Sequence, residues 1–157
     1  MKHLTILILS LLMVSSLVAC QSQRGEVKAH EVWARTAVKG GNGAVYLLLH
    51  NHTNQPDQLI GAESAVAQNV ELHKSEVNDQ GVMVMLKQDA IDLPADGEIL
   101  LQPGGYHIML LGLKQDLKVG DTFEVVLKFR SHPDLPLQVT VKEGGSMDMQ
   151  HGGEGAP

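Results

Sequence analysis

The sequence predicts an all-β fold, a small β-sandwich followed by a flexible C-terminal tail. Short apolar runs with strand character recur over residues 27–141, and none of them has a convincing helical period. Turn residues, chiefly Gly, Pro, Asn and Asp, separate these runs at intervals of roughly ten residues. The chain of 157 residues suits one domain, and its 43% hydrophobic positions are enough to form a core.

Nine strands are expected, in chain order. They cover residues 27–36, 44–51, 58–62, 69–74, 82–87, 98–101, 107–111, 122–130 and 137–141. The turn chemistry between them is clearest at residues 40–43, 54–57, 78–81, 94–97 and 103–105. After residue 142 the composition changes to glycine and polar residues, which cannot bury enough apolar surface to offset their ordering entropy. We therefore assign residues 27–142 to the domain and residues 143–157 to a flexible tail.

The N-terminal segment is expected to be a lipoprotein signal peptide over residues 1–19. Lys2 is followed by an uncharged, largely apolar run over residues 4–18, which is too short for a comfortable membrane span. The run ends in Leu-Val-Ala-Cys at residues 17–20, which resembles a bacterial lipobox. We predict that Cys20 is lipidated and that residues 20–26 link this membrane anchor to the domain. The alternative is ordinary signal cleavage near Ala19, with an unmodified cysteine.

Composition and motifs exclude several function classes. A formal net charge of −6, with no strongly basic stretch, argues against a nucleic-acid partner. The single cysteine rules out an internal disulfide, a CxxC redox pair and a multi-cysteine metal site. The sequence has no GxSxG, HExxH, P-loop or dinucleotide-binding motif, so we predict that the chain is not an enzyme. His50, His52 and Asp57 are close in sequence, but no nucleophile accompanies them, and we expect a solvated polar loop.

Two predicted strands carry histidine on the face that their aliphatic residues do not use. His107 and Met109 are two residues apart, so both point to one face of a strand while Ile108 points to the core. His73 ends another strand, with Leu72 on the apolar face. Taken alone, a strand histidine is usually a solvated surface residue, and a lone methionine is usually core. The recurrence of the pattern in separate segments favours a shared site.

Methionine supplies the second type of donor. Met83 and Met85 share one face of the strand over residues 82–87, and the residues expected on its core side are Val82, Val84 and Leu86. Soft thioethers together with imidazole select copper, above all Cu(I), whereas zinc and calcium prefer other donor sets. Thioethers also form no disulfides in an oxidising compartment. A blue-copper electron-transfer site would need a Cys thiolate, and the one cysteine lies at the predicted anchor.

Three segments resemble the periplasmic copper chaperones of the PCu(A)C family. They are residues 71–73 (Glu-Leu-His), 81–85 (Gly-Val-Met-Val-Met) and 103–113 (Pro-Gly-Gly-Tyr-His-Ile-Met-Leu-Leu-Gly-Leu), and residues 33–35, 43–46 and 117–121 extend the resemblance. The family motif is a His, a Met, a His and a Met. Here the gaps between His73, Met85, His107 and Met109 are 11, 21 and 1 residues, which match that motif. The sequence departs from the family at Lys74, where many members carry a second Met.

The resemblance implies a cupredoxin-like Greek-key sandwich and a Cu(I) site formed by His73, Met85, His107 and Met109. It also implies copper delivery toward the CuA centre of cytochrome c oxidase, with oxidase subunit II or a Sco-type protein as the copper-accepting partner. Met83 is a secondary metal-ligand candidate, because its spacing does not fit the family motif.

The C-terminal tail resembles, in a short form, the His/Met-rich extensions by which some relatives bind Cu(II). Its candidate secondary ligands are Met147, Met149 and His151, and the alternative is a disordered end with chance methionines. The expected location is the cell envelope or periplasm, with a lipid anchor. Gln21, in place of Asp, favours the outer membrane if the host has one. The alternative function is a copper-scavenging or structural lipoprotein without a delivery role.

Overall fold

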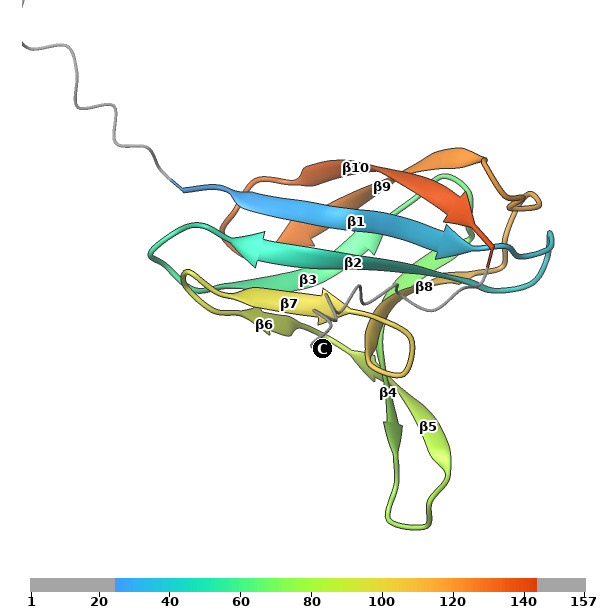
Figure 1. The fold of residues 1–157 in the computed structure, drawn as a ribbon, viewed down its shortest axis with the longest axis horizontal. Coiled ribbons are helices and arrows are strands. Elements are labelled where there is room, and N and C mark those ends of the chain that lie inside the picture. Colours follow the sequence, from blue (N-terminus) through green and yellow to red (C-terminus); the bar gives the residue numbers. More distant parts are fainter. Residues whose placement is uncertain (1–24, 144–157) are drawn as a thin grey trace, which may run out of the picture.

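The computed structural model describes residues 25–143, which fold into ten β-strands (Figure 1). The strands are β1 (Val27–Arg35), β2 (Gly43–Asn51), β3 (Asp57–Glu63), β4 (Asn69–Val77), β5 (Met83–Gln88), β6 (Ile91–Leu93), β7 (Glu98–Leu101), β8 (Tyr106–Leu111), β9 (Thr122–Phe129) and β10 (Leu135–Lys142). The predictions about the anchor and the tail, on Cys20, Met147, Met149 and His151, lie outside the described residues. Residues 25–143 contain no helix of the length and apolarity that a membrane crossing requires.

The strands join in one hydrogen-bonded sheet that folds around a single core. Their order is β5-β4-β8-β7-β2-β1-β10-β9-β3-β6, and β8 also pairs with β2. Strand β1 runs parallel to β10 and antiparallel to β2, so the first and last strands of the domain lie side by side. Buried residues of β2, β3 and β9 belong to the same hydrophobic cluster, so the two halves of the sheet face each other across the core. The predicted all-β sandwich is confirmed.

The alternating pattern of the sequence explains why these segments are strands. Along β9, Phe123, Val125, Leu127 and Phe129 are buried, while the residues between them are exposed or half-buried. This period of two is the signature of a strand with one face on the core. Burying each such side chain contributes on the order of 1.5–3 kcal/mol to the free energy of unfolding. The core therefore holds the strands that carry the candidate ligands in fixed positions.

The nine predicted strands are all present, and β7 (Glu98–Leu101), the sixth of them, has the predicted bounds. Strand β6, which is three residues long, was not predicted. Ile91 and Leu93 are buried on either side of an exposed Asp92. Three residues are too few for an alternating pattern to be distinguished from a loop with two apolar side chains.

The hairpin of β4 and β5 differs from the expectation that Val82, Val84 and Leu86 face the core. Val82 and Leu86 are exposed and Val84 is half-buried. The physical reason is visible in Figure 1, where the outer part of the hairpin extends beyond the body of the sandwich and no other element covers it. The hairpin turn is held by the Asn78 side chain, whose Oδ1 accepts hydrogen bonds from the backbone N–H groups of Gln80 and Val82.

Candidate metal site

The pairing of β4 with β8 places His73 directly opposite His107. Their ring centroids are 5.9 Å apart, with an angle of 46° between the ring planes. In an antiparallel pair, directly opposed residues point to the same face of the sheet. Met109 lies two residues beyond His107 on β8 and therefore shares this face. Met85, on β5, is opposite Ser75, which is two residues beyond His73.

The sheet thus brings all four predicted ligands to one face. Met85, His107 and Met109 line a cavity of about 300 Å³, together with residues that include Arg35, Tyr46 and Ser75. His73 does not line this cavity, but its ring lies next to the ring of His107, which does. Met83 is on the same face but two residue pairs farther out along the hairpin, opposite Val77.

His107 is held as a neutral imidazole with one ring nitrogen available. Its Nδ1 lies 3.1 Å from the carbonyl oxygen of Gly105, and because a carbonyl can only accept, Nδ1 carries the proton. Nε2 is then left with a lone pair for a metal. Burial lowers the pKa of His107, and the nearby His73 lowers it further, against a smaller opposing effect of the Gly105 hydrogen bond.

The burial of His107 differs from the expected outward-facing position. The residue is 4% exposed, although it lies on the face opposite the aliphatic side chains of its strand, as predicted. Strand β2 pairs with β8 here, with Val45 opposite Ile108. The next residue of β2, Tyr46, therefore lies near His107, with 6.4 Å between the two ring centroids. The sequence pattern gives the face of a side chain, but it does not reveal which other element covers that face.

His73 is oriented by a carboxylate. Its Nε2 donates to Glu71 Oε2 at 2.9 Å, and Glu71 Oε1 accepts from Lys87 Nζ at 2.8 Å. The hydrogen bond from His73, followed by that from Lys87, lowers the pKa of Glu71, so the carboxylate stays ionised. With the proton on Nε2, the lone pair of His73 is on Nδ1. A histidine whose second nitrogen donates to a carboxylate is a recurrent arrangement around bound metals.

The His73 Nδ1 atom is buried and has no hydrogen-bond partner among residues 25–143. A buried polar atom without a partner costs on the order of 1–3 kcal/mol of desolvation, and such atoms need an explanation. A metal ion bonded to this lone pair would supply one. The donor chemistry fits a soft ion, because the face offers two imidazoles and two thioethers.

The two thioethers differ in exposure. Met85 is 56% exposed, whereas Met109 is half-buried beside Ala44 of β2. Among residues 25–143, Arg35 is the one charged residue that lines the cavity, and its guanidinium carbon lies 5.8 Å from the centre of the Tyr46 ring.

The sequence analysis assigned no role to Glu71, Lys87 or Arg35. The two-residue spacing of Glu71 and His73 is a usable signal for a carboxylate beside a histidine on one strand face. The positions of Lys87 and Arg35 depend on strand pairing and could not be read from spacing.

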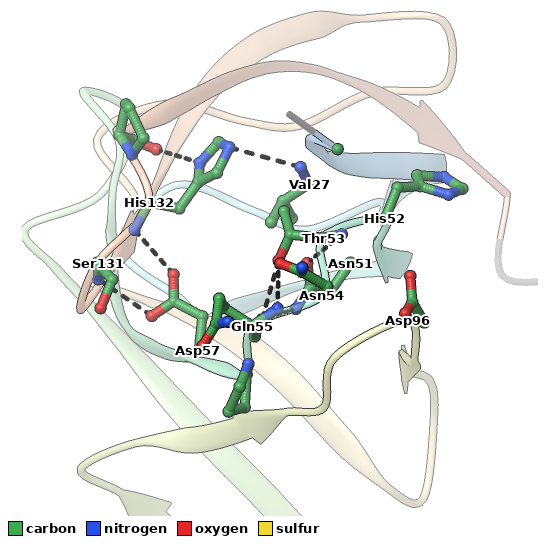
Figure 2. Close-up of a pocket in the computed structure, with 13 residues that line it drawn as sticks. Val27, Asn51, His52, Thr53, Asn54, Gln55, Asp57, Asp96, Ser131 and His132 are labelled. Atoms are coloured by element: carbon green, nitrogen blue, oxygen red, sulfur yellow. Dashed lines mark hydrogen bonds between the residues drawn. The ribbon is translucent and has the colours of Figure 1, made fainter. Parts of the chain in front are cut away.

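A second cavity, of about 570 Å³, lies where β1 begins and β2 ends (Figure 2). Its polar groups bind one another. Asp57 accepts hydrogen bonds from the backbone N–H groups of Ser131 and His132, and the Asn51 amide donates to the carbonyls of Gln55 and Pro94. His52, at its edge, stacks on His50 with 3.8 Å between ring centroids. This arrangement explains how the loops are held together.

Comparison with known proteins identifies the family. The family model described as "Putative lipoprotein LpqE-like" matches residues 27–141. The chain belongs to this LpqE-like, or PCuAC, family. The solved structure of the copper-bound PCuAC domain from PmoF2 is 27% identical with a TM-score of 0.64, and the match covers 76% of this chain and 95% of that one. The solution structure of CuI-DR1885 from Deinococcus radiodurans is 32% identical with a TM-score of 0.57, and the match covers 80% and 84%.

Two sequence relatives of this LpqE-like chain carry no assigned activity. A putative lipoprotein, Lxx21020, of Leifsonia xyli is 29% identical over 121 residues, which are 77% of this chain and 72% of the relative. The uncharacterised protein RP573 of Rickettsia prowazekii is 34% identical over 114 residues, 69% of this chain and 62% of that protein. The predicted resemblance to the PCu(A)C family is therefore confirmed, and so is the prediction of a non-enzymatic protein.

Proposed function

We propose that this LpqE-like protein binds Cu(I) through His73, Met85, His107 and Met109 and carries it outside the cytoplasm. The observation that carries the proposal is the opposed pair His73 and His107, with the buried Nδ1 of His73 left without a partner. In this assignment His73 binds through Nδ1 and His107 through Nε2. Two neutral imidazoles and two thioethers form a soft, uncharged donor set that suits a monovalent ion. Relatives support it, since the PmoF2 domain is copper-bound and DR1885 holds Cu(I).

Release of the ion would proceed by ligand exchange. The exposed thioether of Met85 is the ligand that a donor atom of an accepting protein reaches first. That donor forms a bond to copper as the bond to the Met85 sulfur breaks, and the remaining ligands follow. Copper stays monovalent throughout, so no oxidant or reductant is needed. The half-buried Met109 and the buried His107 hold the ion until the exchange has begun.

The destination we propose is the CuA centre of cytochrome c oxidase, with oxidase subunit II or a Sco-type protein as the accepting partner. A lipid on Cys20 would hold the protein at a membrane of the cell envelope, facing the periplasm, with the outer membrane favoured by Gln21. Membership of a family described as lipoproteins supports this location.

Secondary copper ligands are proposed at two places. Met83 shares the face of Met85 and is 62% exposed, so it can bind an ion that arrives at or leaves the main site. In the tail, Met147, Met149 and His151 are proposed to bind Cu(II).

Copper binding is tested by competition between the purified domain and a Cu(I) chelator. We expect His107→Ala with Met109→Ala to lower the Cu(I) affinity at least about 100-fold, because removal of groups that only orient ligands costs about 10–100-fold. The matched control is His50→Ala with His52→Ala, at the other end of the sandwich. X-ray absorption of the Cu(I)-loaded domain should count two sulfur and two nitrogen scatterers. Equal affinities for the site variant, the control and the unmodified domain would show that the assignment is wrong.

A scavenging or structural lipoprotein is the alternative, and a transfer experiment separates it from a carrier. The Cu(I)-loaded domain is mixed with the apo CuA domain of oxidase subunit II, and the copper content of each is measured after separation. A carrier loses copper to this domain, whereas a scavenger retains it. A structural protein holds no copper at the start.

A further inference from the structure

Exposed apolar side chains concentrate on the hairpin of β4 and β5. Eight large hydrophobic residues of the described chain are exposed, and five of them are on this hairpin or its turn. These five are Val77, Val82, Met83, Met85 and Leu86, with exposed fractions between 45% and 64%. Val77, Met83 and Met85 lie on the face of the candidate metal site, and Val82 and Leu86 lie on the other face.

Metal binding accounts for the exposure of Met85 and Met83, but neither folding nor metal binding explains that of Val77, Val82 and Leu86. The outer part of the hairpin extends from the body of the sandwich (Figure 1), and β5 is the end strand of the sheet, so its outer edge is unpaired. Apolar residues on an open edge strand favour unwanted association, and proteins usually replace them with charged ones. Val77, Val82 and Leu86 also have no donor atom for copper. A cluster of this kind marks an interaction surface.

The charges around the cluster indicate what kind of surface it meets. On the hairpin, Lys87 pairs with Glu71 and Lys74 pairs with Glu76, so these charges cancel. Arg35, at the mouth of the metal cavity, has no ion-pair partner among residues 25–143. The whole chain carries a formal charge of −6. An uncompensated positive charge therefore lies beside the apolar cluster on an otherwise acidic protein.

We propose that the β4–β5 hairpin, together with Arg35, is the docking surface for the copper-accepting protein. The accepting protein contacts both faces of the hairpin around the free edge of β5, with apolar side chains that cover Val77 on one face and Val82 and Leu86 on the other, and with a carboxylate that pairs with Arg35. The proposal rests on the delivery function proposed above. Docking here places the partner's donor atoms beside the exposed sulfur of Met85, where ligand exchange begins. Arg35 orients an acidic partner toward the mouth, while the negative body of the carrier repels it elsewhere.

A second copy of the chain fits this surface less well. A two-fold symmetric dimer uses the same patch on both subunits, so it would bring two Arg35 charges into one interface. Both molecules also carry the same negative charge. A different protein with a carboxylate at this position would neither add a second Arg35 charge to the interface nor need to carry the same net charge.

The test compares two triple variants that each remove three exposed apolar side chains. The hairpin variant is Val77→Thr, Val82→Thr and Leu86→Thr, and the control is Val38→Thr, Ile60→Thr and Val119→Thr, three exposed positions outside the hairpin. Threonine keeps the β-branch at the valine and isoleucine positions, which preserves strand propensity. Each variant is loaded with Cu(I) and mixed with the apo CuA domain of oxidase subunit II, and the transfer rate is followed over a range of partner concentrations.

We expect the hairpin variant to transfer copper at least about 10-fold more slowly at subsaturating partner, with its Cu(I) affinity in the chelator assay unchanged. The control variant should match the unmodified protein in both assays. Arg35→Glu provides a second measurement that does not alter the hairpin, and it should lower the transfer rate most at low ionic strength and least at high salt.

Three results would overturn the docking proposal. One is equal transfer by the hairpin variant and the control. Another is a concentration-dependent dimer of the unmodified protein, seen in sedimentation and lost in the hairpin variant, since the occupant would then be a second copy. The third is copper binding without any transfer to the CuA domain, which also refutes the delivery function. Failure of the proposed copper site is distinct from all three, because the unmodified protein would then not bind Cu(I).

Discussion

The two histidines of the candidate site differ in which ring nitrogen has a free lone pair for a ligand. A side-chain contact sets this for His73 and a backbone contact sets it for His107. Gly105 fixes the proton of His107 on Nδ1, and Glu71 fixes the proton of His73 on Nε2. The family spacing and the alternation along each strand predicted that the candidate ligands at positions 73, 85, 107 and 109 share one site, and strand pairing brings them to one face. The tautomers were not predictable, since they depend on atoms brought together by the fold.

At the residue scale, Glu71 is expected to act as a positioning residue for His73. Glu71→Gln keeps the size of the side chain but removes the charge that holds the imidazole proton. We expect the Cu(I) affinity to fall by about 10–100-fold, as for other groups that orient a metal-bound histidine. The chelator competition assay measures it, and Glu76→Gln, which breaks the pair with Lys74, is the matched control. If both variants bind copper as the unmodified domain does, Glu71 has no such role.

The pKa of His107 leads to a prediction for the pH dependence of apo stability. Burial lowers this pKa below 6.5, the ordinary value, so the unfolded state takes up a proton at a higher pH than the folded state does. The free energy of unfolding should therefore fall as the pH drops through 6.5 toward the lower folded-state pKa. Urea unfolding of the apo domain between pH 7.5 and 5, about the range in which histidines titrate, measures the effect.

His107→Gln should make this pH profile flatter, because glutamine cannot titrate. His132→Gln is the control, since His132 also lies in the folded domain but away from the site. A profile with an unchanged slope in His107→Gln would contradict the expected contribution of this residue.

At the element scale, the hairpin positions Met85 relative to the histidine pair. The register of β4 and β5 sets Met85 opposite Ser75, and the turn over residues 78–81 sets that register. Gly81 has φ of 76°, a left-handed conformation that costs other residues roughly 1–2 kcal/mol. The alternation within each strand was predictable from sequence. The pairing of β4 with both β5 and β8 was not, because strand neighbours are chosen by long-range packing.

Gly81→Ala is expected to loosen the hairpin without unfolding the domain. Hydrogen exchange should quicken at β5 amides, and the Cu(I) affinity should fall severalfold because Met85 is held less firmly. Gly61→Ala is the matched control, since a Cβ at Gly61 has no atom within 4 Å and its φ is not in the left-handed region. Exchange rates at β5 that do not differ between the two variants would show that the turn does not set the position of Met85.

At the scale of the whole molecule, composition and alternation were enough to predict a β-sandwich, because the buried residues of strands such as β9 follow a strict period of two. The prediction that one face of the hairpin packs on the core was wrong for a physical reason. Val82, Val84 and Leu86 alternate as core residues do, and only the position of the hairpin outside the body leaves their face uncovered. The burial of His107 beside β2 has the same origin, since a sequence pattern does not record which distant strand pairs with the one that carries the residue.

Strand β2 runs from one end of the domain to the other. Its first residues, Gly43 and Ala44, pair with β8 beside Met109, while its last residue, Asn51, pairs with Val27 at the start of β1. The strand is nine residues long, which corresponds to a span of roughly 26 Å. A tether attached before Val27 would therefore hold the domain by the end opposite the metal cavity. With a lipid on Cys20, the ion would be held out toward the aqueous space, within reach of proteins whose own metal centres stand clear of the bilayer.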